Sequence, residues 1–243
     1  MDVADEMADA DVSYLGSATL TNNHDALTID ASAAKAISRL ATERQRQLAT
    51  DFAVNRQFRR DVFARSASPR SNEAIAEVLG NVVIGCTTEP ADIGTTVQVP
   101  RGRITFHENF VAALRALMCR GSMTLLKLTK ALGGGSEIDA QVRRNLLYLV
   151  AAGVLTPFAT SYRAPAPRTD LRFADKSVER MFLHVAKGHG PRHIASRVVG
   201  SGIALTVAEA AAVIDAVAGR PHTDARDVPS GLIPRLLRLG LLR

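Results

Sequence analysis

The sequence predicts a mainly α-helical protein, and three observations lead to this fold class. Apolar residues recur at three- and four-residue spacing along most of the chain, as they do on the buried face of amphipathic helices. Alternation typical of strands is confined to short segments around residues 97–106 and 154–158. Three helical stretches lie between these segments, and the order hairpin, three helices and strand is that of a winged-helix domain.

Prolines and glycines divide the chain into modules. The predicted modules are a helical domain over residues 1–90, a winged-helix-like domain with small strands over 91–160, and a C-terminal helical domain over 174–243. Residues 161–173 contain two prolines and are predicted to form a linker.

The first module is predicted to contain two consecutive amphipathic helices. Residues 33–49 follow Asp30 and Ser32, either of which can cap a helix. Residues 51–65 are predicted to restart the helical pattern, with a second apolar stripe flanked by arginines. Three apolar residues repeat there at four-residue spacing: Val54, Phe58 and Val62.

Short motifs predict the ends of several later helices. GGGS at 133–136 follows a helix rather than a strand, so it is interpreted as a C-cap and not as a phosphate-binding loop, and Ser136 as the cap of the next helix. Gly153 is expected to end that helix. Further along, Thr206 and Glu209 predict a capping box, and Ser230 is expected to open the last helix.

Composition limits the class of protein. Apolar residues make up 47% of the 243 residues, which favours a folded globular chain, and no apolar run is long enough for a transmembrane helix. The acidic N-terminus does not resemble a secretory signal, so a cytoplasmic location is expected. Cys86 and Cys119 are expected to be buried free thiols.

No motif predicts a catalytic, cofactor-binding or metal-binding site. Gly200 and Gly202 flank a serine, but the pair lacks the third glycine of a dinucleotide-binding loop and is interpreted as a plain loop. His189 and His193 stand four residues apart, with a glycine and a proline between them that disfavour a helix, and no carboxylate lies nearby to complete a metal site.

Two sequence blocks in the first module resemble the methyltransferase regulatory domain family. The first is DVSYLGSATLTNNHDAL at residues 11–27, and the second is DFAVNRQFRRDVFAR at residues 51–65. The likeness covers residues 1–90 closely and the remainder loosely. The family-motif or interaction candidates are Tyr14, Gly16, Ser17, Asp51, Arg56, Phe58, Arg59, Arg60, Asp61 and Arg65.

The resemblance implies a regulatory or substrate-recruiting module of a bacterial S-adenosylmethionine-dependent methyltransferase. In that family a catalytic domain with a glycine-rich cofactor loop precedes the first block, whereas about ten residues precede it here. The expectation is therefore a chain without catalytic activity of its own, either a stand-alone subunit or a truncated remnant. S-adenosylmethionine would be bound by a missing or separate domain, and the partners would be that catalytic domain or a protein substrate.

Charge patterning leaves two kinds of interaction open. Residues 1–34 carry seven acids and no Lys or Arg, whereas residues 35–70 carry nine bases and three acids. A hydrophobic stripe rimmed by Arg56, Arg59, Arg60 and Arg65 is expected to dock an acidic partner, to fold back on the acidic residues 2–11, or simply to pack internally. That stripe comprises Phe52, Phe58, Val62 and Phe63.

The alternative function is DNA binding through the winged helix. The third helix of the middle module would present Arg143 and Arg144 to a major groove, together with Gln141 and Tyr148. Two acidic residues at the start of that helix, Glu137 and Asp139, would repel phosphates, so the sequence favours protein interaction over DNA binding.

Overall fold

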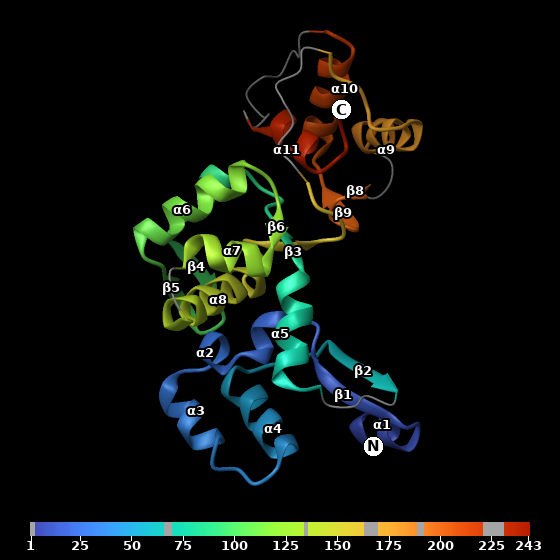
Figure 1. The fold of residues 1–243 in the computed structure, drawn as a ribbon. Coiled ribbons are helices and arrows are strands. Elements are labelled where there is room, and N and C mark those ends of the chain that lie inside the picture. Colours follow the sequence, from blue (N-terminus) through green and yellow to red (C-terminus); the bar gives the residue numbers. More distant parts are fainter. Residues whose placement is uncertain (1–2, 66–69, 134–135, 163–169, 189–191, 221–230) are drawn as a thin grey trace.

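A computed structural model shows the chain as three tiers that follow one another along the sequence (Figure 1). The tiers run from the blue N-terminal part, through the green and yellow helices, to the orange and red C-terminal part. The structure describes residues 3–65, 70–133, 136–162, 170–188, 192–220 and 231–243.

The N-terminal tier combines short helices with a two-stranded antiparallel sheet. Its elements are α1 (Val3–Asp9), β1 (Val12–Ser17), η1 (Leu20–Asn23), α2 (Asp25–Thr28), α3 (Ala31–Ile37), α4 (Glu43–Ala53) and β2 (Asp61–Arg65). Strand β1 pairs with β2, and the register shifts between Tyr14 and Gly16 at a β-bulge.

In its described residues, the middle tier combines four α-helices with a three-stranded sheet and a separate hairpin. Its elements are α5 (Asn72–Asn81), β3 (Val83–Gly85), η2 (Pro90–Asp92), β4 (Thr96–Val99), β5 (Gly102–Thr105), α6 (Glu108–Cys119), β6 (Met123–Thr124), α7 (Leu125–Leu132), α8 (Ser136–Ala151) and β7 (Thr156–Phe158). The sheet has the order β6-β3-β7, and β4 pairs only with β5.

The described residues of the C-terminal tier form three helices and one hairpin. Its elements are α9 (Lys176–Ala186), β8 (His193–Ser196), β9 (Ser201–Ala204), α10 (Val207–Val217) and α11 (Leu232–Arg238). Strands β8 and β9 form an antiparallel hairpin, so Ser201 and Gly202 lie in a strand rather than in the expected loop. No helix in the described parts of the chain is both long and apolar enough to cross a membrane.

The predicted fold class is wrong. Helices account for about 50% of the structure and strands for 18%, which is a mixed α/β content rather than a mainly α fold with a winged-helix module. The hairpin of β4 and β5 precedes the three helices and forms its own sheet, while the central strand β3 comes from a segment assigned to the helical first module. Short strands that pair across long sequence separations leave little periodicity in the sequence.

The predicted helix over residues 51–65 is also wrong. Helix α4 ends at Ala53, and Asn55 adopts a left-handed conformation with φ of 50°. Asparagine tolerates this conformation just after a helix, where it redirects the chain. Residues 61–65 then form strand β2, so the four-residue spacing of Val54, Phe58 and Val62 does not mark one face of a helix.

Local end signals are confirmed where the structure describes them. The carboxylate of Asp30 accepts hydrogen bonds from the backbone N–H groups of Ser32 and Ala33, which caps α3. Thr206 and Glu209 form the predicted capping box of α10. Five predicted features lie outside the described residues or side chains: the cap at Ser136, the prolines at 165 and 167, His189 and the helix start at Ser230.

Two apolar core clusters meet at strand β7. The first gathers Leu27, strand β3 and the helices of the middle tier, and the second gathers the C-terminal tier together with Phe158 of β7. Gly85 on β3 is required here, because a Cβ atom on it would lie 2.3 Å from the Phe158 ring.

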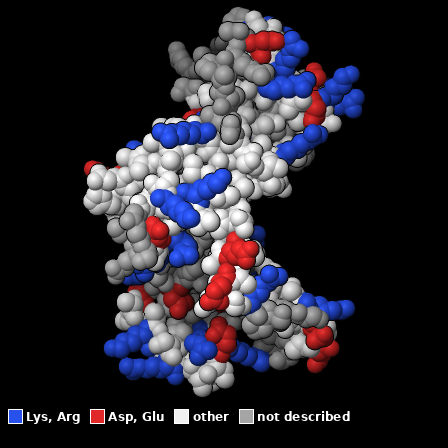
Figure 2. All heavy atoms as spheres, in the orientation of Figure 1, with Lys and Arg blue, Asp and Glu red and all other residues white. Residues whose placement is uncertain are grey.

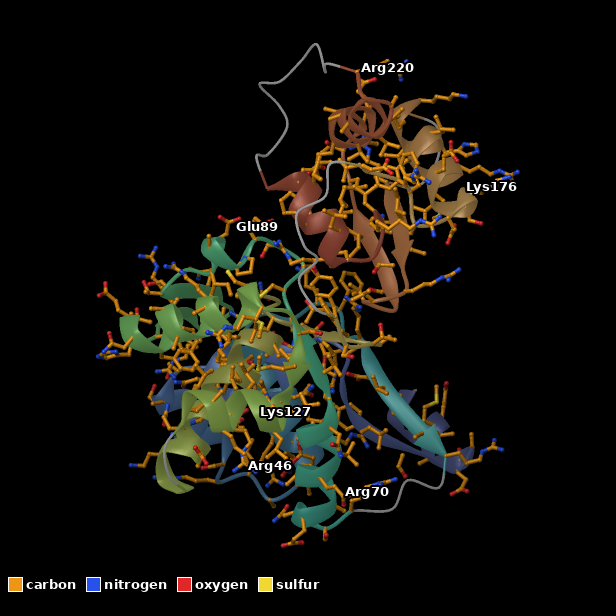
Figure 3. The ribbon with its side chains drawn as sticks, turned by 45° about the horizontal axis from the view of Figure 1, so that its top comes forward. Arg46, Arg70, Glu89, Lys127, Lys176 and Arg220 are labelled. Carbon is orange, nitrogen blue, oxygen red and sulfur yellow. The ribbon has the colours of Figure 1, made fainter. Side chains whose placement is uncertain are left out.

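Polar contacts from α11 tie the C-terminal tier to the middle one. Arg235 Nε donates to the carbonyl of Thr87 at 2.7 Å, and Arg238 Nη2 reaches the Glu89 carboxylate at 2.5 Å. Figure 3 shows Glu89 beside the red helix α11. The Arg238 and Glu89 side chains are 12% and 27% exposed, so this ion pair is largely shielded from water.

Replacing Arg238 is therefore expected to weaken this junction. We expect Arg238→Ala to lower the free energy of unfolding by about 1–3 kcal/mol, because Glu89 loses its charged partner in a largely buried position. Urea denaturation followed by circular dichroism measures this change. Arg180→Ala, at an exposed position on α9, is the matched control and should stay within about 0.5 kcal/mol. Equal effects of the two variants would contradict a structural role for the junction.

The two cysteines differ in accessibility. Cys86 is buried, as expected, and burial raises the pKa of its thiol to about 12. Cys119 is exposed, so the expectation of two buried thiols is wrong for this residue. Cys119 is the last residue of α6 and lies on the side of this helix that faces solvent.

This difference predicts selective alkylation. Because the thiolate is the reacting species, iodoacetamide at pH 8 should modify Cys119 in the native protein and leave Cys86 untouched. Peptide mass spectrometry locates the adduct, and labelling in urea should modify both residues. Rapid native labelling of Cys86 would show that its surroundings open readily.

Candidate functional site

A network of ion pairs gathers most of the family-motif residues at the junction of α4, β1 and β2. Arg59 is its centre: Nε contacts the Asp61 carboxylate at 2.9 Å, and Nη1 contacts Asp51 at 3.3 Å. Nη2 donates to the Tyr14 hydroxyl at 3.3 Å and to Gln47 Oε1 at 3.1 Å. Every nitrogen of this guanidinium is thus engaged.

Aromatic rings extend the network across the sheet. The Arg59 guanidinium carbon lies 5.5 Å from the centre of the Tyr14 ring, in a cation–π arrangement. The Tyr14 ring meets Phe63 of β2 edge to face at 5.7 Å. Burial alone would lower the pKa of Arg59, but its hydrogen bond to the Asp61 carboxylate and the charges of Asp51 and Asp61 raise its pKa above the usual value.

Asp51 joins two arginines. Its second oxygen accepts from Arg56 Nη1 at 2.6 Å, and the Arg56 side chain is only 13% exposed. Arg56 Nη2 is buried and makes no hydrogen bond within the described part of the chain. The described residues therefore pair the Arg56 guanidinium only in part.

The Gly16-Ser17 pair is explained by a side chain that the sequence analysis did not single out. Asn23 Oδ1 accepts from the Ser17 backbone N–H at 2.7 Å, and Asn23 Nδ2 donates to the Ser17 carbonyl at 2.8 Å. The Asn23 amide thus pairs with β1 as a neighbouring strand would. A Cβ atom on Gly16 would lie 3.0 Å from Asn23 Oδ1, so glycine leaves room for this amide.

A cavity of about 400 Å³, named here the β1 cavity, opens beside this network. Its wall is formed by β1, the segment from Asn22 to Asp25, the end of α3, one face of α4, and the side chains of Arg56 and Arg59. Arg46 of α4, which Figure 3 labels in the N-terminal tier, also lines it. The volume lies at the lower end of the range for small-molecule sites.

The structure divides the motif residues into three groups. Five of them line the β1 cavity: Tyr14, Gly16, Ser17, Arg56 and Arg59. Asp51 and Asp61 stand behind them as ion-pair partners. The remaining three, Phe58, Arg60 and Arg65, are exposed. The cavity residues that sequence reasoning missed are Asn22, Asn23, Arg46 and Gln47, of which the two asparagines lie inside the first block.

Two of the four arginines expected to rim the apolar stripe form ion pairs. Arg56 and Arg59 are held by carboxylates, and only Arg60 and Arg65 remain exposed without an ion pair in the described chain. Figure 2 shows basic and acidic side chains interspersed over the N-terminal tier on the face in view. Phe52 and Phe58 are nevertheless 79% and 87% exposed.

The residues proposed for DNA contact do not form a basic surface of their own. Arg143 lines a largely apolar groove between α5 and α7, and Arg144 donates to Gln141 on its own helix. Tyr148 lies edge to face with His24 at 6.0 Å, against the N-terminal tier. Because the winged-helix assignment is wrong, the DNA-binding alternative loses the recognition helix on which it rested.

The β1 cavity is lined mainly by side chains that can form hydrogen bonds. Among the described residues, no group of three or more His, Cys, Asp or Glu side chains is arranged to hold a metal ion. Each acid of the network is saturated by arginine, and the cavity is lined by amides, hydroxyls and guanidinium groups.

Residues 1–65 match the family described as the predicted methyltransferase regulatory domain. This match spans both sequence blocks and the whole β1–β2 sheet, so the resemblance found in the sequence is confirmed for this part of the chain.

Individual relatives extend the comparison to the full length. The chain is 24% identical over 209 residues to the uncharacterized protein sll1526 of Synechocystis sp., which covers 84% of this chain and 40% of that protein. It shares its fold with the structure of PKMT2 from Rickettsia typhi, with a TM-score of 0.59, 14% identity and coverage of 99% of this chain and 57% of the other. The structure of PKMT2 in complex with AdoHcy gives a TM-score of 0.55, 16% identity and coverage of 98% and 54%. The chain thus spans less than two thirds of the length of each relative.

The network predicts different roles for two adjacent arginines. We expect Arg59→Ala to lower the free energy of unfolding by about 1–3 kcal/mol, because Asp51 and Asp61 lose a shared partner in a partly buried position. Arg60→Ala is the matched control, since Arg60 is exposed and unpaired in the described chain, and should change stability by less than about 0.5 kcal/mol. Urea titrations of both variants test this, and an unchanged Arg59→Ala protein would contradict the structural role.

Proposed function

We propose that this chain is a regulatory or substrate-recruiting module of an S-adenosylmethionine-dependent methyltransferase and acts together with a catalytic domain. The observation that carries the proposal is the match of residues 1–65 to the methyltransferase regulatory domain family. The shared fold with PKMT2 over 99% of the chain supports it, since that fold here accounts for only 57% of the other protein. The remaining part of such a protein would supply methyl transfer.

An exposed surface on the N-terminal tier supports a docking role. Phe52 and Phe58 lie at the end of α4 and just before β2, and more than three quarters of each side chain is exposed. Large aromatic side chains exposed to water are typical of contact sites for other proteins. Arg60 and Arg65 are exposed nearby in sequence and would pair with acidic groups on the partner.

Co-purification tests the docking role. The tagged chain is recovered from its native organism, and transfer of tritiated methyl groups from S-adenosylmethionine to protein is measured in the recovered material. We expect methyltransferase activity to accompany the wild-type chain and to fall at least about tenfold with Phe58→Ser, because a buried aromatic anchor contributes 2 kcal/mol or more to binding. Leu183→Ser, at an exposed leucine on α9, is the control and should retain the activity.

Two results would count against the proposal. The first is recovery of the chain without any methyltransferase activity. The second is calorimetry in which the purified chain alone binds S-adenosylmethionine with micromolar affinity, because the cofactor site would then lie within these 243 residues.

A further inference from the structure

The outer face of α9 carries four basic side chains, named here the α9 row: Lys176, Arg180, His184 and Lys187. They recur about once per helical turn, so they lie on one face, and Lys187 at the C-cap keeps a helical backbone. All four are exposed, and Figure 3 shows Lys176 pointing away from the C-terminal tier. The row extends for about 16 Å along the surface.

No described residue neutralises the α9 row. The other exposed ion pairs of this tier join Arg172 to Asp170, Arg197 to Asp175, and Arg220 to Asp215. Glu179 is the one acid within α9, and it forms no ion pair with a described residue. The described surface of α9 therefore presents positive charge that is suited to a negatively charged partner.

A pocket of about 590 Å³, named here the α9 pocket, opens beside the row. Ser177 and Met181 form part of its wall, and they directly follow Lys176 and Arg180, so this wall adjoins the row on the helix surface. The hairpin of β8 and β9 forms another part of the wall, which includes Ala195. Met181 and Ala195 make these walls apolar, so the pocket is suited to an apolar side chain.

The row and the pocket together select among negatively charged partners. An anionic membrane binds a broad apolar face, but in the described C-terminal tier the exposed large apolar residues are Leu183 and Val207, each 39% exposed. Single-stranded nucleic acid stacks on exposed aromatic rings, whereas Phe173 and Phe182 of this tier are half-buried and buried. A phosphate backbone also has no group that would fill an apolar pocket. A protein segment supplies both carboxylates and apolar side chains.

We propose that α9 binds an acidic segment of a partner protein, with its carboxylates along the α9 row and one apolar side chain in the α9 pocket. The pocket gives the contact a buried anchor, whereas exposed ion pairs alone contribute little to affinity. This surface belongs to the C-terminal tier. The inference therefore goes beyond the docking role proposed for Phe52 and Phe58, and it does not depend on a methyltransferase partner.

Peptide selection tests the inference directly. Random twelve-residue peptides displayed on phage are selected on the immobilised full chain, and enriched peptides are synthesised and titrated by fluorescence anisotropy. We expect them to carry net negative charge and a large apolar residue, and to bind more weakly as salt is raised. In the tightest peptide, replacing the acids by their amides, or the apolar residue by serine, should weaken binding about tenfold or more. Duplex DNA and vesicles containing phosphatidylserine should bind more weakly than this peptide.

Charge-reversed variants locate the row. Arg180→Glu combined with Lys187→Glu should weaken binding of the tightest peptide at least about tenfold, because two attractive contacts become repulsive. The matched control is Lys127→Glu combined with Lys130→Glu, at two exposed lysines of α7, and it should bind as the wild type does. Urea unfolding confirms that each variant is folded.

A second pair of variants locates the pocket. Ala195→Leu adds apolar bulk at an exposed position in the pocket wall and should weaken binding about tenfold, because it occupies the space of the anchor. Ala204→Leu, at an exposed position of β9 that does not line the pocket, is the matched control and should leave binding unchanged.

The outcomes that overturn the proposal are distinct. If no peptide is enriched, or if enriched peptides carry no acids, the row is a solvated surface. DNA or vesicles that bind as tightly as any peptide would assign another class of partner. Retained binding after reversal of Arg180 and Lys187 would place the peptide elsewhere, and retained binding in Ala195→Leu would remove the pocket from the interface. None of these results bears on co-purification with a methyltransferase, so each proposal can fail separately.

Discussion

The N-terminal tier depends on one carboxylate, that of Asp51, because this part of the chain has little apolar core. Only three hydrophobic residues of this tier are buried, Leu27, Ile29 and Ile37, and helix α4 buries none among those described. Leu27 itself packs into the core of the middle tier. Asp51 accepts from Arg56 with one oxygen and from Arg59 with the other, so the last turn of α4 is fastened to the segment that leads into β2. Ion pairs therefore hold these segments together, whereas apolar packing does so in the other two tiers.

Such an arrangement has consequences for how substitutions act. A partly buried carboxylate between two guanidinium groups is stabilising only while all partners are present, because removal of one leaves a charge that is poorly hydrated and unpaired. Arg59 lies over the ring of Tyr14 on β1, and that ring contacts Phe63 on β2. Loss of Arg59 would therefore also affect the packing between the two strands. The motif residues that line the β1 cavity therefore shape the tier as well as the cavity.

Local features of this fold could be predicted from the sequence, whereas features that depend on distant pairing could not. The capping box at Thr206 and Glu209 involves neighbours three residues apart, and its geometry follows from those residues alone. Strand β2 pairs with β1 across about fifty residues, and its apolar spacing also satisfies a helical period. Asn55 is a sequence feature from which the end of α4 could have been predicted. Asparagine is one of the few residues that readily adopt the left-handed conformation found there.

The candidate site likewise combines residues that the sequence motifs predict with contacts that only the tertiary structure reveals. The two motif blocks predict which residues matter, yet the site also includes Arg46 and Gln47, which lie outside the blocks and which the tertiary structure brings to them. The sequence predicts that Arg56 and Arg59 belong to a basic rim, but it does not reveal that Asp51 and Asp61 pair with them.

Because Arg56 and Arg59 are paired with carboxylates, the β1 cavity and the exposed surface around Phe58 are two separate surfaces. The sequence alone does not distinguish them. The paired arginines face the β1 cavity and are constrained by Asp51, so they are poorly placed to attract an acidic partner over a distance. Phe52, Phe58, Arg60 and Arg65 remain exposed and take no part in the network, so a partner could cover them without disturbing the ion pairs. Arg59 still bears on that surface indirectly, because it pairs with Asp61 on the same strand that carries Phe63 against Tyr14 and Arg65 toward solvent.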